Sequence, residues 1–355
     1  MTIELRGVTK RVGAEMHLYE TDLTLAERGF NVLLGATGAG KTTLIKVMAG
    51  LEKITTGRIF LHGKDITRVS PQKRNVSLVH QFFVNYPQIT VFENIASPLR
   101  VARLAEGEIR RRVGEAAELM RLTPYLDRRP SELSGGQQQR TALARAVVKD
   151  SAIVLLDEPL ANLDYKLREE LRDELPRLFA DRGAIVVYAT SEPSEALLLG
   201  GHTATLSAGR VTQFGPTSQI YRQPADLITA QVFSDPPMNT ARVTKLGREI
   251  LLESGASWPA QGAIAAAADG SYTMGVRPNF VTPTEDRPDL VRIDGRVLVT
   301  ELSGSESVAH FALPGAVWVS QSHGVHPFEV GAPHAFFLDA ARCLYFGADG
   351  ARVTG

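Results

Sequence analysis

A short apolar run that leads into a glycine-rich loop constrains this chain more than any other feature. Phe30–Leu34 is a mostly apolar run that ends at Gly35, and a helical pattern follows at Thr42–Ala49. In such a loop the backbone N–H groups and the positive end of the helix dipole face one anion, so this arrangement is typical of a phosphate-binding loop. The loop fits the pattern G-x-x-x-x-G-K-[ST] throughout, with Gly35, Ala36, Thr37, Gly38, Ala39, Gly40, Lys41 and Thr42.

The loop predicts an ATP site with a Mg²⁺ ion. Lys41 is expected to hold the β- and γ-phosphates, and the Thr42 hydroxyl is expected to ligate the metal. Thr43 belongs to the same expected set of ATP-binding residues. A chance glycine turn is the alternative, but the strand before the loop and the helix after it are the context that the motif requires.

A second apolar run, Ile153–Leu156, ends in two acidic residues, Asp157 and Glu158. A carboxylate at the carboxyl end of a strand in a parallel sheet lies beside the phosphate loop, so we expect Asp157 to hold Mg²⁺ through water. Glu158 is expected to orient and partly deprotonate the attacking water. Taken alone, these acids could equally be a strand that meets solvent.

The strand and helix patterns alternate and predict an α/β fold with a mainly parallel sheet. An inserted helical subdomain is expected at about 86–150, where no strand pattern occurs, and a domain boundary near Asp235 and two following prolines. We therefore predict a phosphate-loop α/β domain that binds ATP at 1–234. Short strands between glycines and prolines predict a small accessory β-barrel of the OB type at 235–355.

The segment Leu133–Arg140, with the letters LSGGQQQR, is the most informative string in the chain. It places Ser134 at a helix N-cap, followed by Gly135 and Gly136, which allow close approach of a ligand to the backbone. It predicts a second anion site, separate from the phosphate loop.

Together these motifs resemble the ATPase subunits of ABC transporters, within the importer branch that includes maltose and glycerol-3-phosphate uptake. The resemblance covers about residues 1–232 densely, whereas its match to the accessory domain is loose. It implies that two subunits pair head to tail, so that Ser134, Gly135, Gly136, Gln137 and Asp164 of one subunit reach the ATP of the other. It also implies that Gln81 contacts Mg²⁺ and the attacking water.

The partners that the resemblance implies are a second ATPase subunit, identical or different, and two transmembrane permease subunits. A periplasmic or extracellular solute-binding protein would take part indirectly. Asn85–Pro87 and Thr90–Ile95 are similar to the segment that receives the permease. Other strings resemble a subgroup associated with glycerol uptake, so the expected function is ATP hydrolysis that powers import of a small polyol or carbohydrate.

Two positions depart from the family pattern. Ser191 stands where the family has a histidine that contacts the γ-phosphate, and one lost transition-state donor typically costs about 10²–10³ in rate. The chain could therefore be an ATP-binding but weakly catalytic partner in a heterodimer. Val12 stands where an aromatic residue usually stacks on adenine; Tyr19 or His17 could replace it, or both could be ordinary strand residues.

Composition limits the partners and the location. The chain has 39 basic and 39 acidic residues and zero formal net charge, so no nucleic-acid partner is expected. One cysteine, Cys343, fits a reducing compartment. We find neither a signal-peptide pattern nor an apolar run long enough to span a bilayer. We expect a peripheral protein on the cytoplasmic side of the inner (plasma) membrane. A zinc site at His323 and His326 is not favoured, because no cysteine pair supports it.

Overall fold

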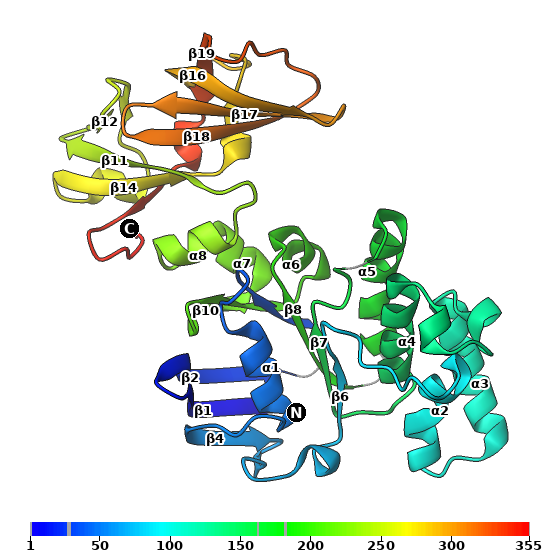
Figure 1. Ribbon diagram of the computed structural model, residues 1–355. Coiled ribbons are helices and arrows are strands. Elements are labelled where there is room, and N and C mark those ends of the chain that lie inside the picture. The colour runs from blue at the N-terminus through cyan, green and yellow to red at the C-terminus, as the bar shows by residue number, and fades with distance from the viewer. Residues whose placement is uncertain (1, 27–29, 162, 181–182, 355) are drawn as a thin grey trace. The chain divides into compact units, whose positions relative to one another are not determined.

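The computed structural model describes residues 2–26, 30–161, 163–180 and 183–354 (Figure 1). The chain divides into two compact units, Met1–Gln219 and Ile220–Gly355, which are described separately. The expected ATP-binding motifs all lie in the first unit, and the expected β-barrel lies in the second.

The first unit is built on a six-stranded sheet of order β10-β9-β3-β8-β7-β6. Its strands β3, β6, β7, β8 and β9 are parallel, and β10 pairs antiparallel with β9 at one edge. The inner strands are almost wholly apolar and buried, as expected for a parallel sheet that is covered on both faces. The strands are β3 (Phe30–Leu34), β6 (Val76–Val79), β7 (Ile153–Asp157), β8 (Ile185–Thr190), β9 (His202–Ser207) and β10 (Arg210–Pro216).

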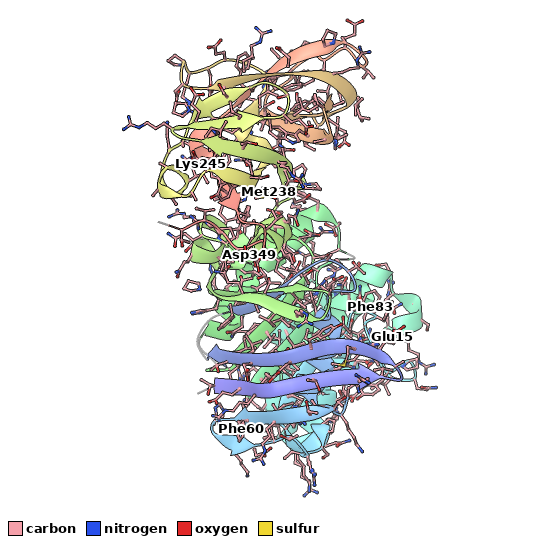
Figure 2. The ribbon with its side chains drawn as sticks, turned by 90° about the vertical axis from the view of Figure 1, so that its left-hand side faces the viewer. Glu15, Phe60, Phe83, Met238, Lys245 and Asp349 are labelled. Atoms are coloured by element: carbon pink, nitrogen blue, oxygen red, sulfur yellow. The ribbon has the colours of Figure 1, made fainter. Side chains whose placement is uncertain are left out.

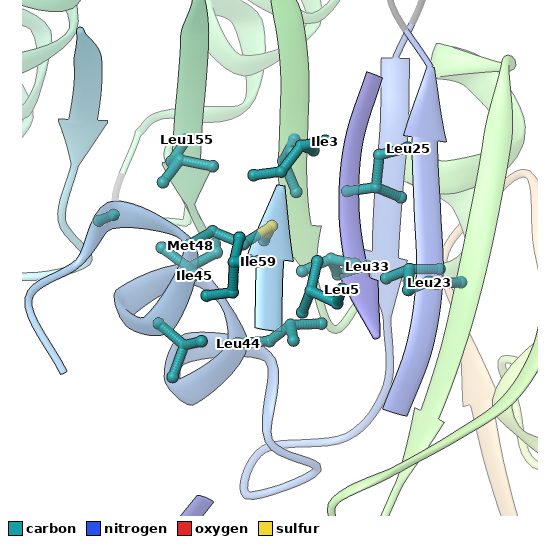
Figure 3. Packing of buried hydrophobic residues seen from close by; sticks show 14 of the residues in the cluster. Ile3, Leu5, Leu23, Leu25, Leu33, Leu44, Ile45, Met48, Ile59 and Leu155 are labelled. Carbon is teal, nitrogen blue, oxygen red and sulfur yellow. The ribbon is translucent and has the colours of Figure 1, made fainter. Parts of the chain in front are cut away.

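A second, antiparallel sheet of order β2-β1-β4-β5 lies in the same unit. Helix α1 (Lys41–Ala49) lies between the two sheets, and its apolar residues meet side chains from both in one buried cluster (Figure 3). In that view Leu44 and Met48 of α1 lie among Ile3, Ile59 and Leu155. This cluster fixes the helix whose first residue follows the phosphate loop. The strands are β1 (Thr2–Val12), β2 (Glu15–Ala26), β4 (Thr56–Leu61) and β5 (Lys64–Asp65).

Between β6 and β7, where every residue is described, the chain forms helices and no strand. These helices are α2 (Val91–Val101), α3 (Glu106–Leu119) and α4 (Gly135–Val147), and Figure 1 shows them grouped beside one another. The other helices of this unit are α5 (Tyr165–Ala180) and α6 (Pro193–Leu199). Helix α7 (Thr217–Arg222) crosses the boundary between the units.

The second unit contains two five-stranded antiparallel sheets that share one apolar core and form a small barrel-like domain. Phe311 and Phe336 stack in this core with ring centroids 3.8 Å apart, and the Trp318 indole N–H donates to the Thr240 carbonyl across the sheets. Lys245, labelled in Figure 2, is buried on β11 and pairs with Asp269 at 2.9 Å. The predicted α/β cassette with an accessory β-barrel is therefore confirmed as a fold class.

The elements of the second unit are short. One sheet contains β11 (Asn239–Leu246), β12 (Glu249–Leu252), β13 (Ser257–Pro259), β14 (Gly270–Val276) and β20 (Leu344–Phe346). The other contains β15 (Val281–Thr282), β16 (Val291–Leu302), β17 (Glu306–Leu313), β18 (Ala316–His323) and β19 (Pro333–Leu338). Its helices are α8 (Leu227–Val232) and α9 (Ala263–Ala266).

Candidate active site

The glycine-rich loop connects β3 to α1 at the carboxyl end of the parallel sheet. Gly38 and Gly40 have φ of 83° and 105°, a left-handed region that favours glycine. At Gly35 a β-carbon would lie 2.4 Å from the carbonyl oxygen of Leu206 on β9, so no larger residue fits there without movement of the backbone. These glycines let the loop turn tightly into the N-terminus of α1.

Lys41 is the first residue of α1, and its side chain is almost fully buried. The ammonium donates to the carbonyls of Gly35 at 2.7 Å and Ala36 at 3.2 Å, and it lies 3.3 Å from a Glu158 carboxylate oxygen. The positive charge is therefore held within the curve of its own loop, where phosphate oxygens would meet it.

Asp157 ends β7 and is buried beside the start of α1. The Thr42 hydroxyl donates to its carboxylate at 3.1 Å. Burial raises the pKa of Asp157, whereas the Thr42 hydrogen bond and the positive field of His80 lower it. The structure thus brings together a hydroxyl and a carboxylate that are 115 residues apart in sequence.

Glu158 directly follows β7 and has an unusual backbone conformation for a non-glycine residue, with φ of 48°. Its N–H donates to the carbonyl of Ala189 on the neighbouring strand β8, which fixes the turn. One carboxylate oxygen accepts a 3.0 Å hydrogen bond from the Gln81 amide, and the other faces Lys41. Gln81 and Glu158, both predicted from sequence, are therefore in direct contact.

A cavity of about 560 Å³ opens over these residues. One side is formed by the phosphate loop with Thr42, Thr43, Gln81 and Glu158. Other lining residues are Glu15, Met16, His17 and Tyr19 of β2. The turn at Ala208 and Gly209, which the sequence did not single out, also lines the cavity. Gly209 belongs there because its N–H donates to the Ala39 carbonyl and its carbonyl accepts from Tyr19 N–H. Volume and lining suit a nucleotide-sized ligand.

The β2 side of this cavity contains both candidate replacements for the missing aromatic residue. His17 and Tyr19 line the cavity, whereas Val12 is half exposed and does not. The guanidinium of Arg210, on β10, lies 3.7 Å from the centroid of the Tyr19 ring. One face of that ring is therefore already covered by a cation, a contact that the sequence pattern did not indicate.

The segment predicted as a second anion site caps the start of α4. The Ser134 hydroxyl accepts from the Gln137 N–H, and the Gln137 side chain accepts from the Ser134 N–H at 2.9 Å, which together form a capping box. Among the described residues, the cavity wall contains neither this segment nor Asp164. A single chain therefore does not bring the two predicted anion sites together.

Comparison with known proteins places this geometry in a family. A family model described as ABC transporter matches residues 18–161. A relative named sn-glycerol-3-phosphate import ATP-binding protein UgpC, from Yersinia pestis, is 34% identical over 99% of both chains. A protein of the same name from Chromohalobacter salexigens is 36% identical over 99% of this chain and 96% of its own length. Another, from Ruegeria pomeroyi, is 37% identical over 88% of this chain and 87% of its own length. The chain belongs to the family of ABC transporter ATP-binding proteins.

Solved structures agree with this assignment. The ATP-binding cassette MJ0796, in a dimeric post-hydrolysis state bound to ADP and Pi, is 28% identical with a TM-score of 0.56 and covers 61% of this chain and 98% of that one. A second dimeric structure of MJ0796, a bacterial ABC transporter cassette, is 29% identical with a TM-score of 0.57 and the same coverage. This ABC protein is thus an ATPase, as predicted. Among its described residues, no helix has the length and apolar character that a bilayer crossing needs.

The position that departs most from the ABC family pattern is exposed. Ser191 comes directly after β8, and within the described ranges it is absent from the cavity wall. The end of β8 just before Ser191 is held by Glu195 of α6, whose carboxylate accepts hydrogen bonds from Thr190 at 2.6 Å and Tyr188 at 3.0 Å. Burial raises the pKa of Glu195, and these two hydrogen bonds oppose that shift.

Three further residues complete the account of this ABC site. Asp164, which the resemblance implies reaches the ATP of the other subunit, accepts from the Leu167 N–H just before α5. Asn162, two residues earlier, lies outside the described residues. His80 was not predicted. Its Nδ1 is buried and, among the described residues, has no hydrogen-bond partner. It lies near enough to Asp157 to help lower the pKa of that carboxyl.

Proposed function

We propose that this ABC protein hydrolyses ATP at the cavity above the phosphate loop to power import of a small polyol or carbohydrate. The observation that supports it best is the contact network of Lys41, Thr42, Gln81, Asp157 and Glu158 at one edge of the sheet. The relatives named for sn-glycerol-3-phosphate import favour a glycerol-like solute within that class. We also propose that the ATP-binding cassette is residues 1–234, with the helical subdomain at about 86–150 and the accessory domain at 235–355.

The loop Gly35–Thr43 is proposed to bind the phosphates. Its backbone N–H groups and the N-terminus of α1 supply a ready anion site. Lys41 exchanges its ion pair with Glu158 for the β- and γ-phosphates, because a phosphate group carries more charge than one carboxylate. That exchange leaves the Glu158 carboxylate free to accept a proton.

The residues present fit a Mg²⁺ ion. Thr42 and Asp157 offer a hydroxyl and a carboxylate 3.1 Å apart, and oxygen donors of this kind are what Mg²⁺ prefers. Gln81 uses its amide N–H for Glu158, which leaves its carbonyl oxygen to complete the set. When bound, the ion neutralises charge on the β- and γ-phosphate oxygens.

Glu158 is proposed to take the proton of the attacking water. Its carboxylate is half-buried, held by the Gln81 amide, and fixed by the backbone hydrogen bond from its own N–H to Ala189. A carboxylate held in this way loses little orientational freedom on reaction. Ser191, which does not line the cavity of its own chain within the described ranges, could donate at most one neutral hydrogen bond to the γ-phosphate, so we expect turnover to be slower than with an imidazole.

Completion of the site requires a second subunit, identical or different. Ser134, Gly135, Gly136, Gln137 and Asp164 lie away from the cavity of their own chain and are proposed to reach the ATP of the partner. The dimeric state of the MJ0796 structures supports this arrangement. Binding of two ATP molecules would then close the dimer, and hydrolysis would reopen it.

The segment that follows Gln81 is proposed to receive two transmembrane permease subunits, with a solute-binding protein acting indirectly. Phe82, Val84 and Tyr86 are 79%, 59% and 51% exposed, an unusual density of large apolar groups on a surface loop. The Asn94 side chain holds the loop through hydrogen bonds to Tyr86 N–H and carbonyl. With this loop against the permease, the protein would lie on the cytoplasmic face of the inner membrane, which is the location that we propose.

Steady-state ATPase assays on the purified chain and on the assembled transporter test this function. We expect Glu158→Gln to reduce turnover by about 10²–10³ while ATP binding persists, and Ser191→His to raise turnover. Exposed Glu118→Gln, on α3, is the matched control and should leave turnover unchanged. Wild-type turnover no higher than that of Glu158→Gln, in both preparations, would refute a hydrolytic role for this chain.

A further inference from the structure

A cavity in the second unit is lined by several arginines, and no acidic side chain among its described lining residues balances their positive charge. It has a volume of about 600 Å³ and lies entirely within residues 221–353. Four arginines line it, Arg222, Arg277, Arg342 and Arg352, and its wall contains no aspartate or glutamate among the described residues. Buried or half-buried arginines normally pair with carboxylates, so this imbalance needs an explanation.

Arg277 and Arg352 are the half-buried members of this arginine cluster. Arg277 donates one hydrogen bond, to the Tyr221 carbonyl at 2.6 Å, and stacks 3.8 Å above the Tyr221 ring. Its Nε is buried and has no partner within the described part of the chain. Burial lowers the pKa of both Arg277 and Arg352, which expresses the cost of keeping these two charges away from water.

The other contacts do not neutralise the cluster. In the residues that the structure describes, the guanidinium groups of Arg222 and Arg352 have no ion-pair or hydrogen-bond partner. Arg342 lies 3.8 Å from Asp339, but Asp339 is held more closely by Arg287 at 2.8 Å. The cavity is therefore lined by two guanidinium groups, the half-buried Arg352 and the exposed Arg222, to which the described part of the chain offers no hydrogen-bond or ion-pair partner.

We propose that this cavity binds a small phosphate ester. A phosphate monoester carries about −1.5 to −2 charges and three acceptor oxygens, which matches several guanidinium groups better than one carboxylate does. Arginine is suited to this role because its planar fork binds two phosphate oxygens at once. The volume falls in the range of small-molecule sites, and Tyr221 and Phe280 add apolar wall for the organic part.

The site differs from the ATP cavity in position and in chemistry. It belongs to the second unit, Ile220–Gly355, and has no glycine-rich phosphate loop, so its ligand is held by side chains. A ligand there would make this unit a sensor of a phosphorylated metabolite. The inference does not depend on the solute that the transporter carries.

Isothermal titration of the full chain with glycerol 3-phosphate tests the site, with glycerol as the uncharged probe. The Lys41→Ala variant lacks the main phosphate ligand of the ATP site. Binding of glycerol 3-phosphate that persists in this variant therefore occurs at another site. We expect binding in wild type and in Lys41→Ala, and affinity at least about tenfold weaker in Arg352→Gln and Arg222→Gln, because each change removes charge-assisted hydrogen bonds. Arg242→Gln, an exposed arginine on β11 outside the cavity, is the matched control and should bind as wild type does.

Thermal unfolding of each variant shows whether it folds. If the glutamine variants do not fold, Arg277→Lys replaces them, because it keeps the positive charge. With Arg277→Lys we expect weaker binding at unchanged net charge, because lysine lacks the fork. The proposal is overturned if glycerol 3-phosphate binds more weakly than about 1 mM, or if Arg352→Gln and Arg222→Gln bind as Arg242→Gln does. Tighter binding of inorganic phosphate than of the ester would also overturn it.

Discussion

Arg74 offers a sharp test of what holds the phosphate loop helix in place. Its guanidinium is buried and donates to four backbone carbonyls: Val69 at 2.9 Å, Thr67 at 3.1 Å, Val47 at 3.0 Å and Met48 at 2.8 Å. The last two belong to the final turn of α1, where a cation also meets the negative end of the helix dipole. Burial lowers the pKa of Arg74, and no carboxylate among the described residues pairs with it, which offsets part of this gain.

Arg74→Met keeps most of the apolar stem and removes all four hydrogen bonds. A hydrogen bond to a charged group contributes about 1.5–3 kcal/mol net, and loss of a partner from a buried charged network costs about 3–5 kcal/mol. Val47 also accepts from the Gly50 N–H and is not left wholly unsatisfied, so we expect a loss near the lower end, about 3 kcal/mol. Exposed Arg68→Met, six residues earlier, is the control and should change stability by less than about 0.5 kcal/mol.

Urea unfolding followed by circular dichroism measures this loss. Both tryptophans, Trp258 and Trp318, lie in the second unit, so their fluorescence reports that unit separately. The helix signal of the first unit should unfold at a lower urea concentration, by roughly 1 M or more. If Arg74→Met and Arg68→Met unfold within about 1 kcal/mol of each other, the carbonyl contacts of Arg74 do not hold α1 and the reasoning is refuted.

Two further predictions concern the same unit. At Gly201, φ is +69° and a β-carbon would lie 2.3 Å from the Phe30 carbonyl oxygen, so Gly201→Ala should cost roughly 2–5 kcal/mol in urea unfolding. Gly63→Ala is its control, with φ +76° but open space, and should lose only about 1–2 kcal/mol; equal losses would rule out the contact. Because the folded pKa of Glu195 is raised, its stabilising effect is full below pH 4.5 and falls as pH rises. Glu195→Gln should therefore gain stability relative to wild type with rising pH, and a pH-independent difference would contradict this.

The sequence predicts those parts of the site whose geometry is local. The loop Gly35–Thr42 could be recognised because its shape follows from glycines between a strand and a helix. Asp157 and Thr42 required one further rule, that the carboxyl ends of parallel strands meet at one edge of a sheet. That rule is sufficient even though β8 lies between β3 and β7. The contact between Gln81 and Glu158 depended on family resemblance, since nothing near either residue indicates the other.

The contacts that the sequence does not predict join residues that no pattern relates. Arg210 covers Tyr19 because β10 runs beside β9 at the edge of the sheet, next to β2, and the packing of those strands decides the pair. Nothing in the sequence around Arg74 indicates that four backbone carbonyls surround its guanidinium in the fold. The cavity arginines are spread from Arg222 to Arg352 and meet only when both sheets of the second unit have formed.

The order of strands in the main sheet has a consequence for synthesis of the chain. Strand β3 pairs with β8 and β9, both of which leave the ribosome long after it. At roughly 5–20 residues per second, β8 follows β3 by roughly 8–30 s, and during that time both edges of an apolar strand have no native neighbour. Unpaired apolar edges are the usual starting points of aggregation. A chain that stops before Ile185 therefore exposes β3, and we expect the yield of such fragments to depend on chaperones that hold nascent chains.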